Sequence, residues 1–267
     1  MADIHIEREH ALGLPAARKL AWFSLARLRL VVAEDGGGGL EALKKALEAG
    51  FADREAAARH GFERSLALRR SALGDDIGVV ENLTDLAALS VDAGDPAQAL
   101  RGFEGALAQL RRIAGPRHPL AIDILRSIGT SQRQMGRRRD ALRSFGEALR
   151  LSGDVQGPSH PATLALRRQH ALLLVEDGQL ALGQRQLLVN HPLILQRYGT
   201  ASAEAAASWD ALGQVAHELG ELDRAHELYL RAARILRDAK AQPALADTLQ
   251  RDAAVLLEAR RARVALR

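Results

Sequence analysis

Three glycines stand at equal intervals in the middle of the chain, with Gly157 midway between Gly115 and Gly199. The first two open similar strings, GPRHP at 115–119 and GPSHP at 157–161. Each is followed by a further glycine halfway to the next of the three, Gly136 after Gly115 and Gly178 after Gly157. The step of about 42 residues falls within the period of roughly 20 to 50 that is typical of solenoids and propellers. We therefore expect an array of similar units and not one globular domain.

The composition favours helices for these units. The chain has 267 residues, of which 3% are aromatic, and alanine, leucine and arginine dominate. These residues are good helix formers and poor strand formers, so we expect an all-α fold. There is no cysteine, which excludes disulfides, thiolate nucleophiles and cysteine metal sites. The net charge of +4 comes from interleaved basic and acidic residues, so it does not demand a nucleic-acid partner.

Four blocks share one layout, which is a first helix, a turn at a glycine and a second helix. They begin at Leu73, Gly115, Gly157 and Gly199. The predicted turns lie at Gly94, Gly136, Gly178 and Gly220. Because one helical hairpin cannot bury its own apolar face, such blocks have to stack on one another.

The fourth block has the clearest motif. It reads Trp209-x2-Leu212-Gly213-x2-Ala216 in the first helix and Ala225-x3-Tyr229-x2-Ala232 in the second. This motif resembles the tetratricopeptide repeat. The second block repeats it with Leu125, Ile128, Gly129, Ala141, Phe145 and Ala148. The resemblance implies a right-handed tetratricopeptide superhelix, an α-solenoid of helical hairpins.

Small and large residues alternate in these motifs for a physical reason. The small residues are expected where the two helices of a hairpin approach closely, and the large ones where neighbouring hairpins meet. The small residues are Gly129, Gly213, Ala99, Ala141 and Ala225. The large ones are Trp209, Phe103, Phe145 and Tyr229.

The repeat length gives a narrower resemblance. Blocks of this period, with His118-Pro119 and His160-Pro161 before the first helix, are similar to the kinesin light chain subgroup of tetratricopeptide repeats. The resemblance covers Leu73 to Lys240. It implies a non-catalytic scaffold that binds peptides or proteins in a groove lined by the first helices, in bacteria often near signalling proteins. The asparagine pair usual in that groove is absent, so the subgroup's peptide preference is not carried over.

The resemblance also implies which side chains face the partner. They are Asp85, Arg126, Thr130, Arg133, Arg168, Gln169, Asp210 and Gln214. Equivalent positions of stacked hairpins lie side by side, so Arg126, Arg133 and Arg168 are expected to form a basic centre flanked by Asp85 and Asp210. Guanidinium groups pair with carboxylate or phosphate through two hydrogen bonds. We therefore expect the partner to be an acidic or phosphorylated protein segment.

The third block departs from the pattern. Arg167 and His170 occupy positions that are apolar elsewhere, and Gly183 replaces the packing alanine. His170 is interpreted either as a satisfied core histidine or as a binding residue beside the groove. Pro192, in the string Asn190-His191-Pro192, falls inside the second helix, where proline removes a hydrogen bond. We expect this helix to end early or to kink near Asn190.

The two ends of the chain are predicted to flank the array. Residues 1–35 are expected to form a lead-in and a capping helix, and residues 36–72 a linker of four glycines followed by a degenerate repeat. The repeats occupy 73–240, and 241–267 should form a helix that caps the last block. The run from Ile4 to Ala21 resembles the start of small bacterial proteins associated with polyhydroxyalkanoate granules.

Motifs for catalysis are absent from the sequence. It has no P-loop, kinase, dinucleotide-binding or G-x-S-x-G motif, and the helix-type zinc motif beginning at His217 lacks its second histidine at Glu221. We expect no catalytic residues, no cofactor and no metal. His118 and His160 are predicted to cap helices. With no membrane-spanning run or signal peptide in sight, the cytoplasm is the expected location.

Two alternatives remain open. One is a regulatory module that contacts nucleic acid through a basic face at Arg137, Arg138, Arg139 and Arg143, although no aromatic residues are interleaved there. The other is a granule- or surface-associated protein anchored by its N-terminus. The sequence does not reveal the oligomeric state.

Overall fold

A computed structural model describes residues 51–265 of the chain, with side chains described for 59–71 and 74–258. This part contains ten α-helices and no strand. The predicted lead-in, the glycine linker and the segment with the granule-family resemblance lie outside the described residues. The chain divides into two compact units, one ending at Met135 and one beginning at Gly136.

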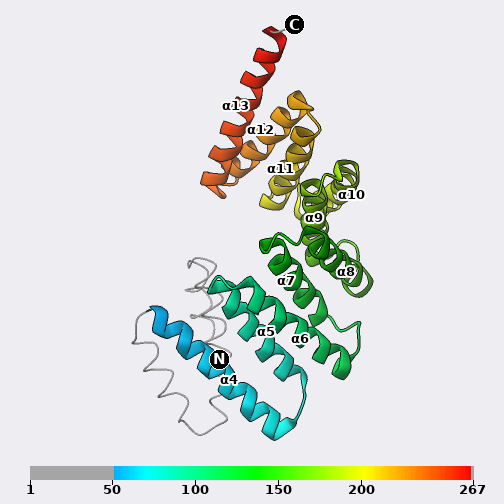
Figure 1. The fold of residues 1–267 in the computed structure, drawn as a ribbon. Coiled ribbons are helices and arrows are strands. Elements are labelled where there is room, and N and C mark those ends of the chain that lie inside the picture. The colour runs from blue at the N-terminus through cyan, green and yellow to red at the C-terminus, as the bar shows by residue number, and fades with distance from the viewer. Residues whose placement is uncertain (1–50, 266–267) are drawn as a thin grey trace. The chain divides into compact units, whose positions relative to one another are not determined.

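The first unit consists of four described helices. They are α4 (Phe51–Leu73), α5 (Ile77–Asp92), α6 (Pro96–Ala114) and α7 (Leu120–Gln134). Each helix packs against the next one along the chain, so the unit is built from neighbouring antiparallel segments (Figure 1). Phe103 and Leu110 of α6 are buried in its core, together with Val79 and Val80 of α5.

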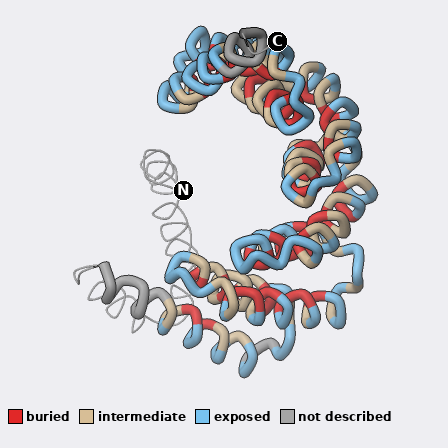
Figure 2. Tube along the Cα trace, turned by 45° about the horizontal axis from the view of Figure 1, so that its top comes forward, coloured by how far each residue is buried: buried red, intermediate tan, exposed pale blue. Residues whose placement is uncertain are grey.

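The second unit contains the remaining six described helices. They are α8 (Arg138–Gln156), α9 (Pro161–Glu176), α10 (Leu180–Tyr198), α11 (Ala203–Glu218), α12 (Leu222–Asp238) and α13 (Pro243–Ala265). Consecutive helices pack together, and α9 also contacts α11, which are the first helices of two successive blocks. Buried residues follow the helix faces that meet within the unit (Figure 2). The predicted all-α fold of stacked helical hairpins is therefore confirmed in the described residues.

Glycines with positive φ separate the helices. They are Gly74, Gly94, Gly115, Gly136, Gly157, Gly178, Gly199 and Gly220, with φ between 71° and 96°. Side chains are strained in this region of backbone space, so glycine is the residue that ends each helix without cost.

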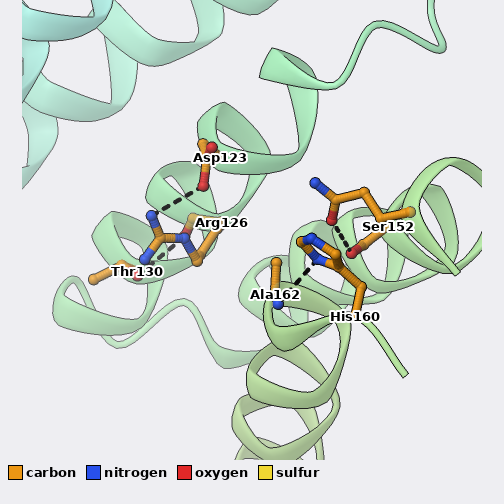
Figure 3. Close-up of polar contacts among 7 residues, drawn as sticks. Asp123, Arg126, Thr130, Ser152, His160 and Ala162 are labelled. Atoms are coloured by element: carbon orange, nitrogen blue, oxygen red, sulfur yellow. Dashed lines mark hydrogen bonds and ion pairs between the residues drawn. The ribbon is translucent and has the colours of Figure 1, made fainter. Parts of the chain in front are cut away.

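Side chains cap the beginnings of the first helices. Asp76 accepts a hydrogen bond from the N–H of Val79 at 2.8 Å, and Ser202 accepts one from Ala205 at 3.0 Å. The Nδ1 atom of His160 accepts from the N–H of Ala162 at 3.3 Å (Figure 3). His118 does the same for Leu120 at 3.2 Å. The predicted capping role is confirmed for His160, the N-cap residue of α9. His118 lies one position before Pro119, the N-cap residue of α7, so its hydrogen bond with Leu120 is not the predicted cap.

The predicted close approaches of helices are present in the second unit. A Cβ atom added at Gly213 would lie 2.7 Å from the Tyr229 ring, so glycine is what allows this ring to pack on α11. Gly183 has a similar role, because an added Cβ would lie 2.6 Å from the side chain of Val175 and 2.7 Å from the carbonyl of Ala171. The third block is therefore not loosened at Gly183. Its two helices approach too closely for the usual alanine.

The expected early end of α10 is wrong. The helix continues through Pro192 to Tyr198. Pro192 has no N–H to donate to the carbonyl of Leu188, one turn earlier. Both residues are exposed, so water can bond that carbonyl and the lost hydrogen bond costs less than it would in a core.

The last described helix packs on α12 with one face. Lys240 and Gln242 have positive φ values of 49° and 46°, and α13 begins directly after them. Four of its residues at helical spacing are buried, namely Ala246, Leu249, Ala253 and Leu256. In addition, the Nδ1 atom of His226 lies 2.7 Å from the carbonyl of Ala253. No helix in residues 51–265 combines the length and apolarity needed to cross a bilayer.

Candidate functional site

A pocket in the second unit lies between α9, α11 and α13, with Ile194 and Tyr198 of α10 also in its walls. Its volume is about 340 Å³. The walls are formed by Pro161, Leu164, Ala165, Arg168, Ile194, Tyr198, Ala203, Glu204, Ala207, Asp210, Gln242 and Leu245. Because α9 and α11 are first helices of successive blocks, the pocket lies on the side where the groove was expected.

Two of the predicted site residues meet in this pocket. Arg168 and Asp210 occupy equivalent positions of the third and fourth blocks, one repeat period apart, and both line it. The Nε2 atom of Gln214, a third predicted residue, donates a hydrogen bond to Oδ1 of Asp210 at 3.0 Å. The expectation that equivalent positions lie side by side is therefore confirmed for this pair.

The electrostatics of Asp210 reflect its partly buried position. Burial raises its pKa above the ordinary value, and the negative charge of Asp252 acts in the same direction. The hydrogen bond from Gln214 and the positive charge of Arg168 lower it. The pocket thus holds a guanidinium and a carboxyl group close to apolar walls such as Leu164 and Leu245. Such a site suits a ligand with both hydrogen-bonding groups and apolar side chains.

The other predicted site residues do not line this pocket. Gln169 of α9 is exposed. In the first unit, Asp85 of α5 is half-buried, and Arg126, Thr130 and Arg133 of α7 are exposed. The structure describes each unit by itself, so the expected meeting of Arg126 and Arg133 with Arg168 stays a prediction.

Local contacts organise two of the α7 side chains. An Nη2 atom of Arg126 lies 3.1 Å from Oδ1 of Asp123, and the hydroxyl of Thr130 donates to the carbonyl of Arg126 at 3.0 Å (Figure 3). Exposed ion pairs of this kind contribute little stability. A ligand anion can therefore replace Asp123 as the partner of Arg126 at small cost.

The sequence prediction missed the third wall of the pocket. Leu245 lies on α13, and Gln242 directly precedes this helix. The sequence predicts only a capping role for this segment. Tyr198 and Glu204 were missed as well. They flank the turn between the third and fourth blocks, and no motif position marks them. For the α9 wall of the pocket the sequence did contain a signal, because residues 161, 165 and 168 recur at helical spacing and so lie on one face of that helix.

The basic segment at the start of α8 is partly neutralised within itself. Arg137 pairs with Asp140 at 2.7 Å, and Arg143 pairs with the same carboxylate. Arg138 and Arg139 are exposed. Two of the four arginines thus already share one carboxylate, which weakens the case for a nucleic-acid contact on this segment.

His170 has a partner inside its own hairpin. Its Nδ1 atom lies 3.0 Å from Oε1 of Gln186 on α10. It does not line the pocket between α9, α11 and α13. This hydrogen bond agrees with the first interpretation, a satisfied histidine, but the residue is only half-buried and so is not a core histidine.

Comparisons with known proteins agree with this fold. Residues 79–154 match the family model described as tetratricopeptide repeat. Among curated proteins, none matches the sequence.

Several solved structures resemble the chain in fold. A candidate kinesin light chain of Podosopora anserina, with nearly identical TPR-like repeats, is 15% identical, with 75% of this chain and 95% of that chain covered and a TM-score of 0.64. BtubC (BKLC) from P. vanneervenii is 19% identical, with 82% and 93% covered and a TM-score of 0.62. YrrB, described as a TPR protein with an unusual peptide-binding site, is 16% identical, with 84% and 97% covered and a TM-score of 0.51.

Proposed function

We propose that this chain, which is a tetratricopeptide repeat protein, binds an extended peptide segment of a partner protein and catalyses no reaction on it. The observation that carries the proposal is the pocket between α9, α11 and α13, in which Arg168 and Asp210 lie together beside apolar side chains. Most of the residues that line this pocket belong to α9 and α11, the first helices of the third and fourth blocks. The peptide-binding site named for YrrB, a protein of similar fold, supports this interpretation.

The charges suggest how the peptide is recognised. Arg168 would pair with a carboxylate or phosphate of the ligand through two hydrogen bonds. Asp210, oriented by Gln214, would accept a backbone N–H, and the walls at Leu164 and Leu245 would hold an apolar side chain. The partner is therefore inferred to have an acidic or phosphorylated core. In the first unit, Arg126 and Arg133 are exposed guanidinium groups with the same chemical preference for anions.

The cellular setting is a further part of this proposal. The similarity to kinesin-light-chain-like repeats supports a scaffold in a signalling or assembly complex, which we place in the bacterial cytoplasm.

A peptide selection tests the proposed function directly. A random dodecapeptide library displayed on phage is selected on the wild-type protein, and the enriched peptides are measured by fluorescence anisotropy. We expect enrichment of Asp or Glu beside apolar residues. Arg168→Glu should weaken binding of these peptides at least tenfold, because it replaces the pairing cation by a repelling charge.

A matched variant controls for a change of net charge. Arg138→Glu lies at the exposed start of α8, outside the pocket, and should change the affinity less than twofold. Equal losses in both variants would mean that the peptide is held by general electrostatics. A selection without any enrichment, on folded protein, would count against peptide binding itself.

A further inference from the structure

A second cleft lies in the same unit, between α8, α9 and α10. Its volume is about 400 Å³. The lining residues are Leu149, Arg167, His170, Leu174, Leu182, Arg185, Gln186 and Val189. None of these residues lines the pocket between α9, α11 and α13, so the two hollows are separate.

The third block is built differently from its neighbours at this cleft. Arg167 stands where the second and fourth blocks have Leu125 and Trp209. Asn190 stands where they have Ala148 and Ala232. Polar residues at two such positions in one hairpin point to a purpose other than packing, because burying polar groups costs free energy unless they are paired.

Asn190 pairs both of its polar ends inside the hairpin. The residue is completely buried, with 0% of its surface exposed. Its Nδ2 atom donates to the carbonyl of Leu164 at 2.9 Å, and its Oδ1 atom accepts from Nη1 of Arg167 at 3.1 Å. The second contact of the guanidinium, to the carbonyl of Pro158 at 3.5 Å, uses the same Nη1. Arg167 is thus anchored by one nitrogen, and its Nη2 and Nε are left for a ligand.

His170 completes a polar wall beside this arginine. Its hydrogen bond with Gln186 orients the ring, and a Cβ atom added at Gly146 of α8 would lie 3.5 Å from its Nε2. The ring therefore reaches across to α8. The opposite wall and rim are apolar, and Leu182 and Val189 are 51% and 54% exposed there.

The charge of the cleft has one sign. The basic side chains Arg167 and Arg185 line it, and no acidic side chain does so in the part of the chain that the structure describes. Burial lowers the pKa of Arg167, which means that its charge is incompletely solvated. An anion beside the guanidinium would offset that cost.

We propose that this cleft binds an organic carboxylate with an apolar body, such as a medium-chain aliphatic acid. The carboxylate pairs with the free edge of the Arg167 guanidinium, whose two donors match its two oxygens. Arg185, at the rim, adds positive charge. The aliphatic chain lies against Leu149, Leu174, Leu182 and Val189. The volume is within the range of small-molecule sites, roughly 300 to 1,000 Å³.

Calorimetry with octanoate tests the proposal. Octanamide, a neutral molecule of nearly the same shape, and octylamine are the matched ligands. We expect octanoate to bind to the full-length protein at least tenfold more tightly than octanamide, and octylamine not to bind. Equal affinity for octanoate and octanamide would overturn the proposal, because the guanidinium would then contribute nothing.

The key variant is the double substitution Arg167→Leu with Asn190→Ala. It restores the residues of the second block, Leu125 and Ala148, so it should fold with an unchanged or higher Tm. We expect at least a tenfold loss of octanoate affinity in this variant and a smaller loss in Arg185→Gln. Unchanged octanoate binding in the folded double variant would refute the assigned cleft.

The variant Arg168→Glu separates the two sites. It lies in the other pocket and should leave octanoate binding unchanged. Conversely, the double variant should bind peptides selected on the wild type with unchanged affinity. If Arg168→Glu abolished octanoate binding, the carboxylate would belong to the first pocket and this inference would be wrong.

Discussion

The guanidinium of Arg231 lies over the ring of Trp209, with its central carbon 4.1 Å from the ring centroid. The ring of His191 meets the same indole edge-on, with centroids 4.0 Å apart. Trp209 itself is only partly buried, but it packs against two buried clusters, one joining α9 to α11 and one joining α11 to α13. Trp209 on α11 thus contacts both buried clusters, which together include residues of the helices from α9 to α13.

Replacing Trp209 by alanine should therefore loosen both clusters. We expect a loss of about 2 to 4 kcal/mol in the free energy of unfolding, below the full cost for a completely buried aromatic residue. The damage should spread to α13 through α12, because stability in repeat proteins is coupled between neighbours. Hydrogen exchange of the amides in 244–258 measures this. Unchanged protection there would show that α13 is stabilised independently of Trp209.

The His191 side chain predicts a pH dependence. Its Nδ1 atom lies 2.8 Å from the hydroxyl of Ser208. Burial, and then the charge of Arg231, lower its pKa below the ordinary value of 6.5. The folded state thus binds fewer protons at this site than the unfolded state. The contribution to stability is complete above pH 6.5 and is lost as the pH falls through the lowered pKa.

The variant His191→Leu isolates this effect. Leucine is the residue at the equivalent position of the second block, Leu149, so the substitution is expected to be tolerated. Between pH 8 and pH 5 the Tm of the wild type should fall more than that of the variant. Other titrating groups are common to both proteins and cancel. Parallel Tm curves would show that His191 does not contribute to the pH dependence.

Gly183 and Gly105 give opposite predictions for the same substitution. An alanine at Gly183 would press on Val175 and on the backbone of Ala171, so Gly183→Ala should destabilise by about 1 to 3 kcal/mol. At Gly105, in the helix α6, an added Cβ has no atom within 4 Å, and Gly105→Ala should stabilise by up to about 1 kcal/mol. Thermal unfolding of the two variants decides it. A stabilised Gly183→Ala would mean that the third hairpin is packed as loosely as its sequence suggests.

Removing α13 should affect both stability and binding. A chain ending at Lys240 exposes the face of α12 that α13 covers, including Leu236, and loses Leu245 from the pocket. We expect self-association, measured by light scattering, and a loss of affinity for selected peptides. A truncated protein that stays monomeric and binds those peptides normally would show that α13 is dispensable for both.

The repeat architecture was predictable because its causes are local. A glycine with positive φ follows each described helix from α4 to α11, and a small residue is needed where two helices touch, so Gly157, Gly178 or Ala225 can be interpreted one block at a time. The capping role of His160 follows in the same way from its place beside proline.

Contacts between distant residues were decided by the tertiary structure alone. Asn190 looked like the start of a helix break, yet it is the buried partner of Arg167, 23 positions away in the sequence. Arg168 and Asp210 were expected to be neighbours from their equivalent positions, but the third wall from Leu245 was not. The period of the chain determines which helices stack. Which polar groups find partners, and which hollows stay open, depends on the distances between those helices.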